Sequence, residues 1–112
     1  MKCIFCEIVK KKIPAKIIEE TKDILVIEDI NPKAPIHLLI IPKKHIKSVI
    51  DLKEKDSKIV SEMILISKKI AKKEKVKGYK LVFNVGKEGG QEIFHLHLHF
   101  LAKLENNKPI NL

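Results

Sequence analysis

Three histidines, His95, His97 and His99, alternate with Leu96 and Leu98 near the end of the 112-residue chain. A spacing of two residues is the period of a β-strand, so we expect the three imidazoles on one face and the leucines on the other. A hydrophobic core requires the leucines but not the histidines. Because imidazoles serve as nucleophiles, acid–base groups and metal ligands, the pattern predicts a reactive or metal-binding face.

A glycine-rich loop at residues 86–91 precedes this segment. Gly89 and Gly90 leave neighbouring backbone N–H groups unobstructed, and successive N–H groups can form a concave site for an anion. At neutral pH an uncharged imidazole can attack phosphorus, and a second histidine can protonate the leaving group. Phosphoryl or nucleotidyl transfer through a covalent histidine intermediate is therefore a coherent reaction class.

Cys3 and Cys6 have the spacing of zinc ligands, and a structural zinc site of this kind needs two further ligands. The alternative is a pair of small residues packed beside a helix. His45 follows a predicted strand and is one candidate for a further ligand, and His95 is the preferred second candidate because its use leaves the central histidine free. The histidines then left for chemistry are His37, His97 and His99.

Length and composition predict a single domain, residues 1–112, in the cytoplasm. The chain is 45% hydrophobic and 33% charged, as in globular proteins, and no apolar run reaches the ~18–20 residues of a membrane span. No signal peptide is visible, so no membrane association is expected. The net charge is +9, but every basic residue is Lys. Because Arg is the usual residue for base recognition, no specific nucleic-acid partner is expected.

Hydrophobic periodicity predicts an α+β domain with a mainly antiparallel sheet of about five strands. One short and one long helix accompany the sheet, and residues from about 104 form a tail. The predicted helices span residues 3–12 and 51–75, and the predicted strands span residues 17–20, 24–28, 37–41, 80–85 and about 95–103.

With these residues the sequence resembles the histidine triad (HIT) family of nucleotide-binding proteins. The family signature is three histidines alternating with apolar residues and followed by two apolar residues, and residues 95–101 match it at every position. Other matching segments are Cys-Ile-Phe-Cys-Glu-Ile at the start and residues 13–16, 29–37, 41–46 and 89–91. These segments resemble the small adenosine phosphoramidase-type hydrolases, whereas the nucleotidyltransferase branch typically has Gln at the position of His99.

The resemblance implies cleavage of a purine nucleoside 5′-phosphoramidate of the AMP-amine or AMP-lysine type. His97 would attack the α-phosphate to form a nucleotidyl-histidine intermediate that water hydrolyses. His99 would contact the phosphate or the leaving group, and His37 would complete the cluster. The resemblance implies that Ile27 and Ile30 make apolar contacts to the base and that Asp29 binds the ribose hydroxyls. It also implies phosphate or ribose contacts from Asn84, Gly90, Gln91 and Glu92.

The resemblance also implies a structural zinc ion on Cys3, Cys6, His45 and His95, and a homodimer with joined sheets. No organic cofactor is expected. Glu92 stands where several members have Ser or Thr, so a second hypothesis is an AMP-sensing regulatory module with weak catalysis. A third hypothesis is a zinc hydrolase with all three alternating histidines on one ion. On a straight strand the outer Cα atoms are about 13 Å apart, so binding one ion with all three side chains would be strained.

Overall fold

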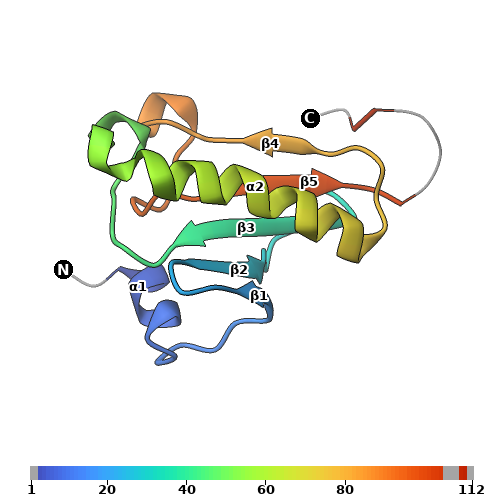
Figure 1. Cartoon of the computed structure of the whole chain (residues 1–112), viewed down its shortest axis with the longest axis horizontal. Coiled ribbons are helices and arrows are strands. Elements are labelled where there is room, and N and C mark those ends of the chain that lie inside the picture. Colours follow the sequence, from blue (N-terminus) through green and yellow to red (C-terminus); the bar gives the residue numbers. More distant parts are fainter. Residues whose placement is uncertain (1–2, 105–108, 111–112) are drawn as a thin grey trace.

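The computed structural model describes residues 3–104 and 109–110 and confirms the α+β architecture (Figure 1). Five strands form one sheet in the order β1-β2-β3-β5-β4, and every neighbouring pair is antiparallel. The strands are β1 (Ile17–Glu20), β2 (Ile24–Glu28), β3 (Ile36–Pro42), β4 (Lys80–Val82) and β5 (Leu98–Ala102), and the helices are α1 (Ile4–Val9) and α2 (Ser57–Glu74). Most of the predicted tail lies outside the described residues, and the single-domain assignment stays a prediction.

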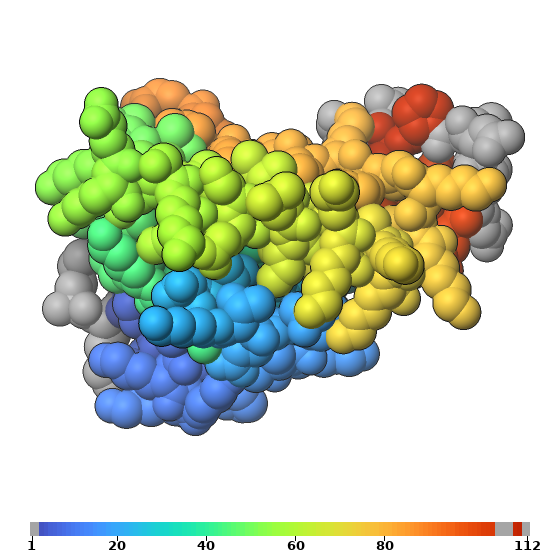
Figure 2. Space-filling model, viewed as in Figure 1, coloured from blue at the N-terminus to red at the C-terminus, as the bar shows by residue number. Residues whose placement is uncertain are grey.

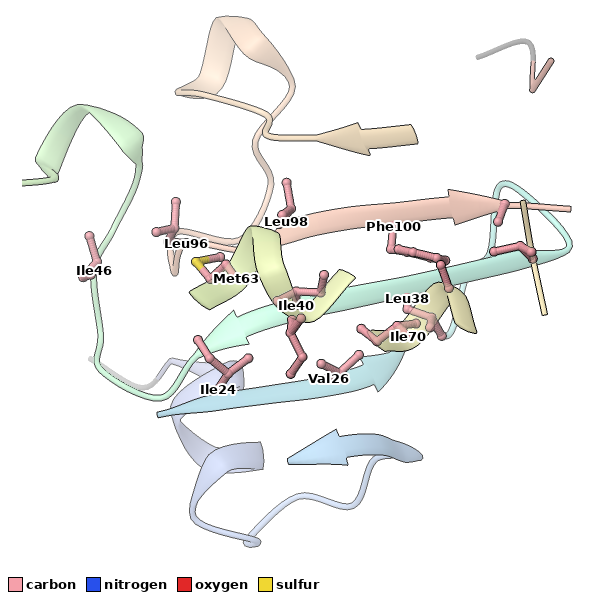
Figure 3. Close-up of a cluster of buried hydrophobic side chains, with 14 residues drawn as sticks. Ile24, Val26, Leu38, Ile40, Ile46, Met63, Ile70, Leu96, Leu98 and Phe100 are labelled. Carbon is pink, nitrogen blue, oxygen red and sulfur yellow. The ribbon is translucent and has the colours of Figure 1, made fainter. Parts of the chain in front are cut away.

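The two central strands bury side chains on both faces of the sheet. On one face, Val26 and Ile40 pack with Met63 and Ile70 of α2 and with Phe100 (Figure 3). In the space-filling view, the side chains of α2 and of the segment that follows it cover most of this face (Figure 2). α2 therefore closes the larger core and leaves the opposite face for other contacts.

The opposite face carries a second, smaller core closed by α1. Phe5 and Ile8 of α1 pack with alternate residues of β2 and β3, namely Leu25, Ile27, Leu39 and Ile41. Since His37 alternates with Leu38 in β3 and His99 with Phe100 in β5, both histidines lie on the α1 side of the sheet. Strand periodicity thus separates the α2 core from the polar site.

The long helix begins at Ser57, six residues later than predicted. Two short 3-10 helices, η1 (Val49–Asp51) and η2 (Glu54–Asp56), precede it. The carboxylate of Asp56 accepts hydrogen bonds from the Lys53 N–H at 3.0 Å and from Lys44 Nζ at 2.8 Å. Because Leu52 and Lys53 have extended backbone angles, the helical path is interrupted there. At its C-terminus the helix ends at Lys75, which adopts a left-handed conformation with φ 60°.

The prediction of a continuous histidine strand was wrong, because β5 begins only at Leu98. β3 ends at Pro42, which lacks an N–H, and the N–H of Leu96 bonds to the carbonyl of Ile46 at 2.6 Å instead of to β3. Because β5 begins only at Leu98, its pairing with β4 ends at Val82, opposite His99, rather than at residue 85. The alternation of faces nevertheless survives, since Leu96 and Leu98 both pack in the α2 core.

No helix in the described part of the chain is long and apolar enough to cross a membrane. The cytoplasmic location stays a prediction.

Candidate functional site

A cluster of two cysteines and two histidines joins α1 to the loop after β3 and to the segment before β5. Cys3 Sγ lies 3.3 Å from His95 Nδ1, Cys6 Sγ lies 3.4 Å from His45 Nδ1, and the two Nδ1 atoms are 3.1 Å apart. All four ligand atoms lie within 4.8 Å of one another. The structure therefore brings together the four residues predicted as metal ligands.

The donor set fits a zinc ion. Ligand atoms about 2.0–2.3 Å from one tetrahedral metal lie about 3.3–3.8 Å apart, close to the observed separations. His95 Nε2 lies 2.7 Å from the carbonyl oxygen of Pro42, and since a carbonyl only accepts, Nε2 carries the proton. The lone pair of His95 is then on Nδ1, facing the cysteines, as in metal-binding histidines whose other nitrogen is hydrogen-bonded.

The charges of this cluster also favour a cation. Burial lowers the pKa of His95 to about 4, so its imidazole is neutral and able to coordinate at neutral pH. Burial and the neighbouring Cys3 raise the pKa of the Cys6 thiol. A raised pKa means that deprotonation of the thiol is less favourable, and a bound metal ion would compensate by stabilising the thiolates.

His97 presents one free nitrogen. Its Nδ1 lies 2.7 Å from the carbonyl oxygen of His95, so Nδ1 carries the proton and the lone pair is on Nε2. Nε2 makes no hydrogen bond to any residue in the described ranges. His97 is buried, and this burial lowers its pKa, so the imidazole is neutral at pH 7 and meets the requirement for a nitrogen nucleophile.

His37 and His99 form a hydrogen-bonded pair beside His97. The backbone N–H of Lys33 donates to His37 Nδ1 at 3.0 Å, so neutral His37 carries its proton on Nε2. That nitrogen lies 2.9 Å from His99 Nδ1 and 3.4 Å from Asp29 Oδ2. His99 Nδ1 accepts a hydrogen bond from this N–H, which leaves the proton of neutral His99 on Nε2.

Burial lowers the pKa of His37 and lowers the pKa of His99 to about 4. The nearby Asp29 carboxylate acts in the opposite direction on both. Asp29, His37 and His99 are close enough together to hold a metal ion. However, a metal on His37 Nε2 would displace its proton to Nδ1, where it would meet the Lys33 N–H, so a hydrogen-bond relay fits these residues better.

The three alternating histidines do not converge on one ion. His95 faces the cysteines, His97 contacts the carbonyl of His95, and His99 faces His37. This geometry disfavours a catalytic zinc ion on all three. It gives each of the three histidines a different set of partners.

The glycine loop is held together by its own hydrogen bonds. The N–H groups of Gly89, Gly90 and Gln91 donate to carbonyls within the loop. The buried Gln91 side chain accepts from the Gly86 N–H at 3.0 Å and donates to the carbonyls of Lys47, at 2.7 Å, and Ile93, at 3.1 Å. Gln91 therefore supports the loop, and its side chain has no group left for a ligand in this conformation.

The remaining predicted nucleotide contacts differ in accessibility. The Glu92 side chain is exposed, and its N–H makes no hydrogen bond to the residues that the structure describes, which leaves it as a donor for phosphate. Asn84 Nδ2 lies 3.5 Å from His99 Nε2. Ile27 is buried in the smaller core, whereas Ile30 is 89% exposed beside Asp29.

Phe5 contacts two of the histidines but was not among the predicted site residues. Its ring lies edge-on to His97, with centroids 5.0 Å apart, and edge-on to His95 at 5.8 Å. Its position between two candidate metal ligands, Cys3 and Cys6, was the available signal. Helical periodicity predicts that Phe5 is buried but not which side chains it contacts.

Comparison with known proteins places this site in a family. A family model described as scavenger mRNA decapping enzyme C-term binding matches residues 2–109. An uncharacterized HIT-like protein of Buchnera aphidicola subsp. Baizongia pistaciae is 48% identical over 107 residues, covering 94% of this chain and 96% of that protein. The chain belongs to the histidine triad family.

Solved structures agree with this assignment. A HIT family hydrolase from Legionella pneumophila matches with a TM-score of 0.90 and 44% identity, covering 98% of this chain and 96% of that one. A zinc-bound histidine triad protein from Mycobacterium smegmatis matches with a TM-score of 0.82 and 33% identity, covering 96% and 79%. The resemblance in the sequence is thereby confirmed at the level of family and fold, and the chain is similar to HIT hydrolases.

Proposed function

We propose that this HIT protein hydrolyses purine nucleoside 5′-phosphoramidates of the AMP-amine or AMP-lysine type through a nucleotidyl-histidine intermediate on His97. The observation that carries the proposal is the hydrogen bond from His97 Nδ1 to the carbonyl of His95. It leaves a neutral imidazole with its lone pair on Nε2, and the centroid of the His99 ring lies 5.0 Å from that of His97.

In the first step His97 Nε2 forms a bond to the α-phosphorus and the P–N bond to the amine breaks. Burial keeps the His37–His99 pair uncharged in the free protein. When substrate binds, its anionic phosphate raises the proton affinity of the pair, which then takes up one proton from solvent. That proton passes from His99 to the departing amine. In the second step water attacks phosphorus, returns a proton to the pair and releases AMP from His97.

The substrate contacts follow from the same geometry. Asp29 lies at the end of the relay beside exposed Ile30, where it would accept hydrogen bonds from the ribose hydroxyls while Ile30 contacts the base. The N–H of Glu92 is the loop donor for a phosphate oxygen. Gly90, Asn84 and Ile27 stay predicted contacts.

A structural zinc ion on Cys3, Cys6, His45 and His95 completes the proposal, supported by the donor set and by the zinc-bound relative from M. smegmatis. When bound, zinc would stabilise the thiolates and cross-link three segments of the chain. It would take no part in bond cleavage.

The protein is also proposed to form a homodimer. β4 is an edge strand whose paired neighbour is β5, and Leu81 of β4 and Ile64 and Leu65 of α2 are exposed. A second copy of the chain would cover these apolar side chains and extend the sheet. Light scattering of the wild type and of Leu81→Lys tests this, because a charge at the joined edge should yield monomer.

The decisive experiment traps the intermediate. Wild type is mixed with an AMP-amine substrate, quenched in base because phosphorus–imidazole bonds are acid-labile, and analysed by mass spectrometry with fragmentation across residues 88–103. We expect an added AMP on His97 and none on His95 or His99. His97→Ala should form no adduct and show no turnover, and turnover that survives in this variant contradicts the proposal.

One observation favours the AMP-sensing alternative. The N–H groups of Gly89, Gly90 and Gln91 are already bonded within the loop, and the neighbouring Glu92 brings a negative charge near the phosphate position. A sensor would bind AMP tightly and form no adduct. Calorimetric titration with AMP beside the trapping experiment separates the two functions.

A further inference from the structure

Phe5 connects the metal cluster to the proposed nucleophile. It lies between Cys3 and Cys6, and its side chain is only 3% exposed. The ring meets His95 and His97 edge-on, with interplanar angles of 80° and 79°. A single aromatic ring thus contacts one candidate metal ligand and the residue that would attack the substrate.

The position of Phe5 depends on α1, which spans six residues. A helix this short is not stable on its own in water, so tertiary contacts must hold it in place. Those contacts are the burial of Phe5 and Ile8 and the approach of both cysteines to His45 and His95. A metal ion bound by the four ligands would clamp α1 to the segment that carries His97.

The His97 ring has three close neighbours. Its Nδ1–H bonds to the carbonyl of His95, and the ring centroids of Phe5 and His99 each lie 5.0 Å from the centroid of His97. Rotation of the imidazole would break the hydrogen bond and change both ring contacts. Without the Phe5 ring, only the hydrogen bond to His95 and the contact with His99 would orient His97 Nε2.

We propose that Phe5 is a positioning residue through which metal occupancy at Cys3, Cys6, His45 and His95 controls the orientation of His97 Nε2. A metal on these four ligands would have two routes to His97, one through His95, whose carbonyl holds His97 Nδ1, and one through α1 and Phe5. The proposal assigns the effect to the second route. This inference rests on the proposed function for its kinetic consequence. The contact between the Phe5 and His97 rings is independent of that function.

The test compares wild type and Phe5→Leu, each loaded with zinc and after removal of zinc by a chelator. Leu replaces the aromatic wall but keeps an apolar side chain in the core. Met63→Leu is the control, because Met63 is fully buried in the α2 core and lies outside the cluster that holds α1. The measurements are kcat, the AMP dissociation constant, and nuclear Overhauser effects between ring protons of Phe5 and His97.

Removing zinc from wild type should weaken the Phe5–His97 Overhauser effects and lower kcat about tenfold, within the ~10²-fold that a 1 Å misplacement costs. The AMP dissociation constant should change less than about threefold, because the perturbed group acts on the reacting atom. Phe5→Leu with zinc should already be about tenfold slow, and zinc removal should slow it no further. Met63→Leu should keep the wild-type rate and zinc response.

An equal loss of rate on zinc removal in Phe5→Leu and wild type overturns the proposal, as do unchanged Overhauser effects in zinc-free wild type. If zinc-free wild type unfolds, the zinc-loaded Phe5→Leu and Met63→Leu proteins still decide the role of Phe5 in kcat. If no protein turns over substrate, the proposed function fails, and the Overhauser effects alone decide the coupling.

Discussion

Replacing Gln91 by alanine should weaken the fold more than it weakens nucleotide binding. The Gln91 amide makes three hydrogen bonds, one to Gly86 within the glycine loop and two to the carbonyls of Lys47 and Ile93 outside it. Each is worth about 1 kcal/mol net, and deletion of one buried methylene adds about 0.8 kcal/mol. The variant no longer loses the conformational entropy of the Gln side chain on folding, which offsets the loss by about 1.5 kcal/mol. The expected loss in free energy of unfolding is therefore about 2–3 kcal/mol.

The assay is urea denaturation at fixed zinc concentration, beside calorimetric titration with AMP under native conditions. With a denaturant slope of about 1.5 kcal/mol per molar, the midpoint should fall by about 1.3–2 M. The AMP dissociation constant should rise less than about tenfold, a loss of under about 1.4 kcal/mol. Lys87→Ala, an exposed change in the same loop, should alter the free energy of unfolding by less than about 0.5 kcal/mol.

The opposite pattern would refute the structural role of Gln91. If Gln91→Ala keeps the wild-type midpoint but loses AMP affinity by far more than tenfold, its side chain contacts the nucleotide, as the family resemblance implies. The loop would then have to open on binding and release the Gly86 and Lys47 bonds.

Other predictions follow from burial and charge. His99 should titrate by NMR near its pKa of about 4. As the pH falls, the unfolded chain binds this proton near pH 6.5, before the folded protein does, so stability should fall between about pH 6.5 and 4. The fall should be less steep in His99→Asn. Lys44 lowers the pKa of Asp56, so Asp56→Asn should be less stable than wild type at pH 7, and this difference should vanish as the pH falls below the lowered pKa of Asp56 in thermal melts. Met63→Ala should cost about 2–5 kcal/mol in urea with kcat unchanged, because fully buried Met63 lies on the α2 face.

Local patterns in the sequence predicted most of the fold. β1 and β2 occupy the predicted residues without error, because β-branched runs bounded by polar turns are local signals. The start of α2 was missed, because the interruption depends on Asp56 bonding to Lys44, twelve residues away. The length of the histidine strand was missed because Pro42 of a different strand ends the pairing.

The sequence by itself determined which groups are available and which way they face. The alternation of His95, His97 and His99 with apolar residues separates the imidazoles from the α2 core, and the cysteine pair predicts a metal site. Only the tertiary structure decided which partners each histidine contacts. The carbonyl of Pro42, 53 residues from His95, directs Nδ1 to the cysteines, and the Lys33 N–H determines which nitrogen of His37 donates to His99. Periodicity sets the direction of a side chain, but the proton on an imidazole is placed by partners that only folding brings near.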